Sequence, residues 1–159
     1  MITVLGVGNI ILRDEGLGVR AVEFLQNHFE FPAEVQLIDG GTLGIELTYF
    51  LDTTDKLLII DSINGAKSPG TIFRLEGESI KKHFSEKISA HEVGIQDVLT
   101  SMEITGHKIP ETIVIGAQPF DLDAGLNLSI GMKKIFPWIV LESIKILREW
   151  EVNMIWKKF

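Results

Sequence analysis

Short apolar runs recur along the chain and predict the strands of a sheet. Residues 2–7 and 56–60 are mostly apolar, as expected of strands that are buried on both faces. Residues 34–38 alternate between polar and apolar side chains, and residues 112–115 form another apolar run before a glycine. Residues 71–75 also alternate, which favours an edge strand that runs antiparallel to its neighbour.

Between these runs, the spacing of the apolar residues changes to that of helices. Apolar residues recur on one helical face over residues 17–25, and a short helix is expected over residues 45–51. A third helical pattern covers residues 93–102. Ser129 is suited to cap a long C-terminal helix. We expect Pro137 to interrupt or bend this helix, because proline lacks the amide hydrogen and its ring collides with the preceding turn.

Strands that alternate with helices in this order predict a single α/β domain over residues 1–159. The expected architecture is a three-layer sandwich with a mostly parallel sheet of about five strands and one antiparallel edge strand. A chain of 159 residues has the size of one such domain.

Charge and composition exclude several classes of protein. The chain has 15 Lys and Arg against 22 Asp and Glu, and its net charge of -7 repels phosphate backbones, so we expect no nucleic-acid partner. The absence of cysteine excludes a disulfide scaffold and cysteine-based metal sites. No run approaches the ~20 apolar residues of a membrane span. The first residues do not resemble a signal peptide, so we expect a cytoplasmic protein without membrane partners.

Polar residues lie after the predicted strands or on the adjoining loops, and four of them are candidates for a site: Glu15, Asp39, Asp61 and His91. Ligand sites of parallel sheets lie beyond the carboxyl ends of the strands, which favours a functional role for these positions. The sequence motifs of several common classes of nucleotide-binding protein and hydrolase are absent. The chain has no phosphate-binding loop and no nucleophile elbow, and Ile95 stands where a zincin motif starting at His91 needs its second histidine.

Glu15, Asp61 and His91 could together bind a divalent cation. Carboxylates and imidazole are suitable ligands, and three protein ligands leave coordination positions open for water or substrate. Simpler interpretations exist for each residue. Glu15 and its neighbour Asp14 suit the start of a helix, Asp61 could cap a strand, and His91 could be a loop histidine. The other histidines lack a surrounding motif and are expected to be ordinary loop residues: His28, His83 and His107.

The ordered motifs of the chain resemble those of the hydrogenase maturation proteases. The resemblance spans about residues 6–131 and rests on Gly6-Val7-Gly8-Asn9, Asp14-Glu15-Gly16-Leu17-Gly18-Val19-Arg20, Asp39-Gly40-Gly41-Thr42-Leu43-Gly44, Asp61, Ala90-His91-Glu92-Val93-Gly94 and Gly116-Ala117-Gln118-Pro119. The later Gly125, Leu128 and Ser129 fit the closing motif of the family.

The resemblance implies a cytoplasmic endopeptidase that removes a C-terminal extension from the large-subunit precursor of [NiFe]-hydrogenase after nickel insertion. It also implies that Glu15, Asp61 and His91 bind metal. The metal is nickel supplied by the substrate, and other divalent cations could occupy the same ligands. Many relatives have alanine where this chain has Ser62, which keeps the Asp61 ligand but could change its surroundings. We expect the protease to be a monomer.

For the hydrolysis itself, we hypothesise that a carboxylate activates water while the metal anchors the substrate chain. Asp39 is the candidate, because it ends a neighbouring strand in a glycine-rich turn and has no role in binding the metal. Two other functions use the same three ligands. One is a nickel-binding hydrogenase chaperone without peptidase activity, and the other is a zinc metallohydrolase.

Overall fold

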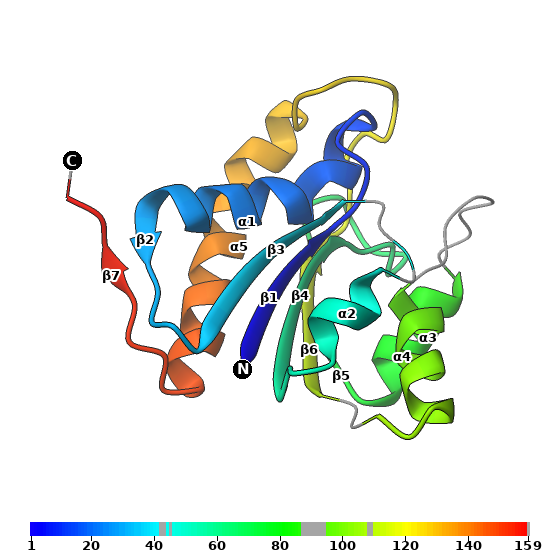
Figure 1. The fold of residues 1–159 in the computed structure, drawn as a ribbon. Helices are drawn as coiled ribbons and strands as arrows, with labels where there is room; N and C mark the ends of the chain where they lie inside the picture. The colour runs from blue at the N-terminus through cyan, green and yellow to red at the C-terminus, as the bar shows by residue number, and fades with distance from the viewer. Residues whose placement is uncertain (42–43, 45, 87–94, 108–109, 159) are drawn as a thin grey trace.

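The computed structural model describes residues 1–41, 44, 46–86, 95–107 and 110–158. The strands of its main sheet are Ile2–Val7 (β1), Val35–Gly41 (β3), Lys56–Ser62 (β4), Ile72–Glu76 (β5) and Glu111–Ala117 (β6). Within the described residues this sheet has five strands, in the order β3-β1-β4-β6-β5 (Figure 1). All neighbouring pairs are parallel except β5 and β6. The predicted mostly parallel sheet with an antiparallel edge strand is therefore confirmed.

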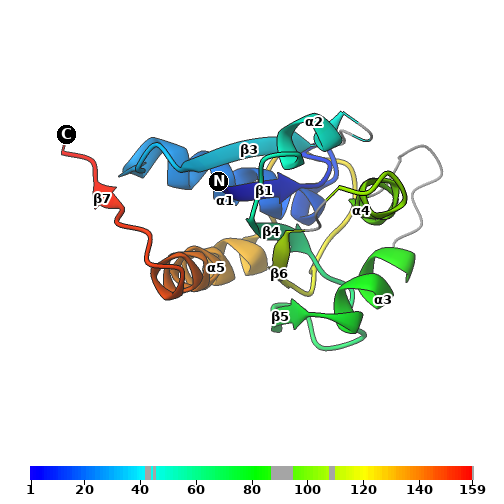
Figure 2. The same ribbon diagram turned by 60° about the horizontal axis from the view of Figure 1, so that its bottom comes forward.

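Helices cover both faces of this sheet. One face carries α1 (Leu17–His28) and α5 (Ile130–Glu149). The other face carries α2 (Leu47–Leu51), α3 (Glu78–Glu86) and α4 (Ile95–Ile104). A turn of 3₁₀ helix, η1 (Arg13–Gly16), precedes α1. Figures 1 and 2 show the resulting layers, which are those of the predicted three-layer α/β sandwich.

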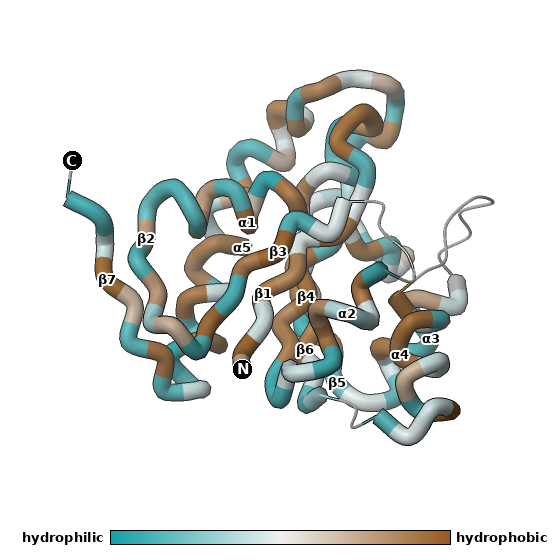
Figure 3. Tube along the Cα trace, viewed as in Figure 1, coloured by the Kyte–Doolittle hydropathy of each residue, from teal (hydrophilic) through white to brown (hydrophobic). Residues whose placement is uncertain are grey.

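Strand β4 shows how one strand contributes to two cores. Leu58 and Ile60 join the core beneath α1 and α5, whereas Leu57 and Ile59 join the core on the other face. Successive side chains of a strand point to opposite faces, so a strand covered on both sides needs apolar residues at every position. All four residues are fully buried. Figure 3 shows the same hydrophobic character along the middle of the sheet.

Pro137 lies inside α5 and does not interrupt it, so that part of the prediction is wrong, whereas the alternative that it bends the helix stays a prediction. The helix continues over Ile130–Glu149, and its start is capped as predicted, because the Ser129 hydroxyl accepts a hydrogen bond from Met132 N at 3.1 Å. Proline cannot donate to the carbonyl four residues earlier, which belongs to Lys133. Pro137 and Lys133 are both exposed, so this carbonyl lies on the side of the helix that faces water.

Several elements were not predicted. Helix α3 is one of them, and a small antiparallel sheet of β2 (Phe29–Glu30) and β7 (Ile155–Trp156) is another. This pairing brings the C-terminal segment back to the end of α1, where Lys157 N donates to the His28 carbonyl at 2.8 Å. Among the helices in the described ranges, none combines the length and the apolar character that crossing a membrane requires.

Candidate functional site

The carboxyl ends of β1 and β4 lie side by side where the winding of the sheet changes direction. From β1 the chain passes through α1 to β3 on one side, and then through α2 to β4 on the other side of β1. Neighbouring strands whose connections leave in opposite directions form the usual ligand site of a parallel sheet. Residues that follow β1 or end β4 therefore occupy the position where a site is expected.

Glu15 is one of the predicted ligands at this position. It lies on η1, just after β1, and its side chain is half-buried. The hydroxyl of Ser62, the last residue of β4, donates a hydrogen bond to Glu15 Oε2 at 2.9 Å. This contact brings the Glu15 carboxylate to the end of β4, although the two residues are 47 positions apart in the sequence.

Asp61, the residue before Ser62, is the second predicted ligand and is fully buried. Its carboxylate oxygen Oδ2 lies 3.3 Å from Nε2 of His83, which is itself only 8% exposed. His83 lies on α3, so the Asp61 side chain faces the α3 side of the sheet, whereas Ser62 faces the α1 side. The alternation of a strand thus directs two consecutive residues of β4 to different partners.

Gly8 lies between the Glu15 backbone and the Asp61 carboxylate, at a position that strongly favours glycine. Its φ of +131° is a conformation that other residues rarely adopt, and a Cβ at this position would overlap the carbonyl oxygen of Glu15. The same Cβ would lie 3.8 Å from Asp61 Oδ1. The backbone of η1 and the Asp61 carboxylate therefore approach each other closely because Gly8 lacks a side chain.

Asp39, the predicted catalytic residue, lies at the same edge of the sheet but on a different strand. It is exposed near the end of β3 and pairs with Gly6 of β1, which in turn pairs with Ile60 of β4. Two strand spacings place the Asp39 backbone about 10 Å from that of β4. Asp39 and the Glu15–Asp61 pair thus share one end of the sheet.

His91, the third predicted ligand, lies outside the described residues, so its convergence with Glu15 and Asp61 stays a prediction. The described part of the chain ends at residue 86 after α3 and resumes at residue 95 with α4. Within the described ranges, no group of three or more His, Cys, Asp and Glu residues is arranged to hold a metal ion.

Asp14 is a buried anchor and not only an acid at the start of a helix. It is fully buried, and its carboxylate accepts hydrogen bonds from the backbone nitrogens of Phe120 and Asp121, at 2.9 and 3.0 Å. Ser129 donates to the same carboxylate from its backbone nitrogen and its hydroxyl, both at 2.8 Å. The residue next to Glu15 is therefore fixed to the loop between β6 and α5.

His83 is the residue that sequence reasoning placed wrongly. It was expected to be an ordinary loop histidine, but it is buried on α3 and contacts Asp61. Ile80, His83 and Phe84 follow the spacing of one helical face in an otherwise polar segment. This spacing was the available signal that His83 points inward.

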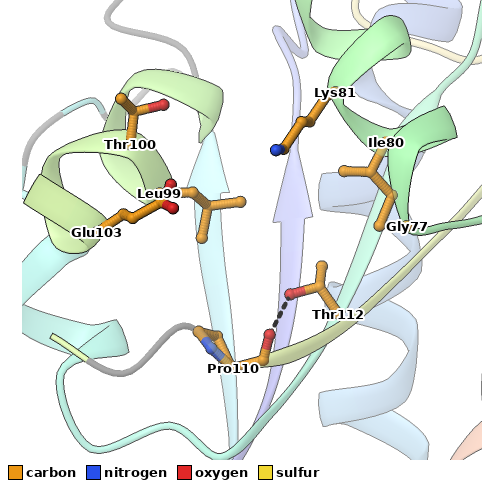
Figure 4. Close-up of a pocket in the computed structure, with 8 residues that line it drawn as sticks. All are labelled: Gly77, Ile80, Lys81, Leu99, Thr100, Glu103, Pro110 and Thr112. Carbon is orange, nitrogen blue, oxygen red and sulfur yellow. Dashed lines mark hydrogen bonds between the residues drawn. The ribbon is translucent and has the colours of Figure 1, made fainter.

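A cavity of about 220 Å³ lies elsewhere, between α3 and α4 (Figure 4). Its lining consists of Gly77, Ile80, Lys81, Leu99, Thr100, Glu103, Pro110 and Thr112. Thr112 is near the start of β6, whereas Asp61 pairs with Gly116 near the end of that strand. Four residues of strand correspond to about 13 Å. The cavity is thus at the other end of the sheet from Glu15 and Asp61.

Comparison with known proteins gives matches along most of the chain. A family model described as hydrogenase maturation protease matches residues 19–146. The hydrogenase 2 maturation protease of Escherichia coli (strain K12) is 37% identical over 155 residues, which cover 97% of this chain and 94% of that protein. The hydrogenase expression/formation protein HupD of Rhizobium leguminosarum bv. viciae is 37% identical over 153 residues, covering 95% of this chain and 76% of that protein.

Solved structures agree with these matches. The hydrogenase maturating endopeptidase HybD from E. coli has a TM-score of 0.91 at 36% identity, and the alignment covers 98% of this chain and 97% of that one. The [NiFe] hydrogenase maturation protease HybD from Thermococcus kodakarensis has a TM-score of 0.74 at 26% identity, with 91% of this chain and 97% of that one covered. Because both the sequence and the fold match over nearly the full length, the chain belongs to the hydrogenase maturation protease family and is a peptidase.

Proposed function

We propose that this peptidase removes the C-terminal extension of the large-subunit precursor of [NiFe]-hydrogenase, and that nickel held by the precursor is the feature it recognises. The observation that carries the proposal is the position of Glu15 at the end of β4, where the hydroxyl of Ser62, the residue after Asp61, donates to the Glu15 carboxylate. Membership of the maturation protease family supports the choice of substrate.

Nickel is part of the substrate in this proposal and not a resident cofactor. Glu15 and Asp61 offer carboxylate oxygens, and His91 offers an imidazole nitrogen, all of which are suitable ligands for a divalent transition metal. A precursor that carries nickel gains these ligands when it docks, whereas a precursor without nickel does not. Metal insertion is thereby converted into binding affinity, and only the loaded precursor is held long enough to be cut. Other divalent cations can occupy the same ligands.

Asp39 is the proposed general base for the hydrolysis. An exposed carboxylate can accept the proton of a water molecule that attacks the scissile carbonyl. Its separation of about 10 Å from β4 lets Asp39 act on the peptide while Glu15 on η1 and Asp61 on β4 bind the metal. Holding the substrate in one orientation is the contribution of the metal-binding residues.

An exposed apolar surface next to the site is the proposed contact for the rest of the precursor. It consists of Ile10, Ile11 and Leu126, which are 37%, 55% and 63% exposed. The two loops are joined, because Gly125 N donates to the Ile11 carbonyl at 2.9 Å. Exposed apolar patches of this kind mark interaction sites. Asp14 joins the same two segments, so this apolar loop surface and Glu15 are held in one rigid arrangement.

The test is incubation of the purified chain with nickel-loaded and nickel-free precursor, followed by mass spectrometry of the large subunit. We expect a loss of mass at the C-terminus with the loaded precursor only. Binding without a change in mass would favour the chaperone. One tightly bound zinc per chain, with cleavage of the nickel-free precursor, would favour the metallohydrolase.

Asp39 is tested in the same assay. Asp39→Asn should keep the nickel-dependent binding of the precursor and abolish its cleavage. Full activity of this variant would remove Asp39 from the mechanism. Cleavage in the cytoplasm by a monomeric protease completes the proposal, and cell fractionation and light scattering check these two points.

A further inference from the structure

Glu15 and Asp61, the two predicted acidic ligands, each accept a hydrogen bond from a residue that was not predicted to bind the metal. Ser62 Oγ lies 2.9 Å from Glu15 Oε2, and His83 Nε2 lies 3.3 Å from Asp61 Oδ2. Both donors are buried, with 4% of Ser62 and 8% of His83 exposed. The His83–Asp61 contact is buried and the Ser62–Glu15 hydrogen bond is partly buried. Hydrogen bonds to carboxylates are stronger than those between neutral groups, so both contacts restrict the carboxylates.

The two contacts come from opposite faces of the sheet and meet at the end of β4. Asp61 points toward α3 and receives His83, whereas Ser62 points toward η1 and donates to Glu15. Strand β4 is paired with β1 as far as Ile60, and with β6 through Asp61 and Ser62. The end of a central strand is a rigid support, so it fixes the two acids relative to each other.

In both contacts the donor engages one oxygen of the carboxylate. A carboxylate has two oxygens with lone pairs, so a hydrogen bond at one oxygen is compatible with a cation at the other. Asp61 Oδ1 is the oxygen on the Gly8 side, where η1 and Glu15 approach. A hydrogen bond at Oδ2 is therefore consistent with an orientation of the Asp61 carboxylate in which Oδ1 lies on the Gly8 side, near the backbone of η1.

We infer that Ser62 and His83 are positioning residues that orient the carboxylates of Glu15 and Asp61 for the metal of the precursor. The inference rests on the proposed function, since it assigns a role to the contacts of the same site. His83 acts through Asp61 and is not itself a ligand, because its Nε2 is directed at Asp61 Oδ2. Loss of such a partner typically lowers metal affinity by about 10–100-fold.

Two pairs of variants separate these roles. Ser62→Ala and His83→Leu remove the donors, whereas Ser62→Thr and His83→Gln keep a hydroxyl and an N–H. The matched control is His107→Leu, which removes another His–Asp pair, between His107 Nε2 and Asp52 Oδ1 at 3.0 Å. That pair is exposed and lies near the amino ends of the strands.

The full-length variants are titrated with Ni²⁺ by calorimetry and assayed with nickel-loaded precursor, after thermal unfolding shows that each is folded. Ser62→Ala and His83→Leu should each weaken Ni²⁺ binding by about 10–100-fold and raise KM for the precursor more than they lower kcat. Ser62→Thr and His83→Gln should recover most of the affinity, and His107→Leu should match the wild type.

Wild-type affinity and KM in both Ser62→Ala and His83→Leu would overturn the inference and leave the proposed function intact. If His83→Gln binds Ni²⁺ as weakly as His83→Leu, then His83 is a ligand and its assigned role is wrong. Failure of the wild type to cleave the loaded precursor would instead contradict the proposed function. The outcomes of the two proposals are therefore distinguishable.

Discussion

The Asp14 carboxylate accepts two hydrogen bonds from Ser129, which lies 115 positions later in the sequence. The backbone nitrogen and the hydroxyl of Ser129 each donate at 2.8 Å. Ser129 is also the residue that caps α5. The buried acid beside Glu15 thus joins the start of α1 to the start of α5. One carboxylate sets the position of two helices and of the loop that precedes α5.

Removal of this carboxylate should destabilise the fold. Asp14→Ala leaves partly buried N–H groups of the loop before α5 without their acceptor, and each lost hydrogen bond costs about 1 kcal/mol. We expect a decrease of about 2–4 kcal/mol in the free energy of unfolding, measured by urea denaturation. Asp123→Ala, an exposed acid on the same loop, is the control and should change stability by less than about 0.5 kcal/mol. Equal stability of the two variants would contradict the anchoring role of Asp14.

Gly8→Ala should be more harmful than the same substitution at another glycine with positive φ. A Cβ at Gly8 collides with the Glu15 backbone, whereas a Cβ at Gly77, with a φ of +61°, has no atom within 4 Å. Gly77→Ala should cost about 1–2 kcal/mol from backbone strain alone. Gly8→Ala adds displacement of η1, so we expect a larger loss of stability and loss of precursor cleavage. Urea denaturation and the cleavage assay of both variants check this difference.

The ion pair between Arg74 on β5 and Glu149 at the end of α5 predicts a pH dependence. The hydrogen bond from Arg74 lowers the pKa of the Glu149 carboxyl, and the charge of Arg74 adds to the effect. A lowered pKa in the folded state contributes stability above the unfolded pKa of about 4.3, and this contribution disappears as the pH falls through the folded value.

Glu149→Gln should therefore be less stable than the wild type at pH 7, and the difference should shrink as the pH falls below about 4.3 and through the lower pKa of the folded state. Urea denaturation at several pH values measures this difference in the free energy of unfolding. Glu103→Gln, at an exposed position of α4, removes the same charge and controls for the change in net charge. A difference in stability that stays unchanged over the whole acidic range would show that the ion pair is not its cause.

Burial on two faces explains why most of the sheet could be predicted from the sequence. The run at residues 56–60 corresponds to β4, and the alternating residues 71–75 correspond closely to β5. Helix α3 escaped prediction because only Ile80 and Phe84 supply large apolar side chains in a polar segment. Packing of these two residues against the core, and not local propensity, stabilises α3.

The site was predictable only in part, because its contacts join distant segments. The ends of the strands indicated the edge of the sheet where Glu15 contacts Ser62, the neighbour of Asp61, whereas the convergence of Glu15, Asp61 and His91 on one metal stays a prediction. Ser62 was expected to affect Asp61, but strand alternation directs it to Glu15 instead. The burial of Asp14 depends on backbone donors more than 100 residues later, for which the local sequence contains no signal.

The apolar loop surface of Ile10, Ile11 and Leu126 gives the last prediction. A charge placed on a surface that is buried in a complex must lose its water, which weakens binding without affecting the free protein. Leu126→Asp should therefore raise KM for the nickel-loaded precursor roughly tenfold and leave kcat and stability almost unchanged. Ile104→Asp is the control, since Ile104 is 80% exposed at the far end of α4, and it should leave KM unchanged. An equal KM for Leu126→Asp and the wild type would show that the precursor docks elsewhere. That result would not affect the proposed requirement for nickel, which is measured separately with the same substrate.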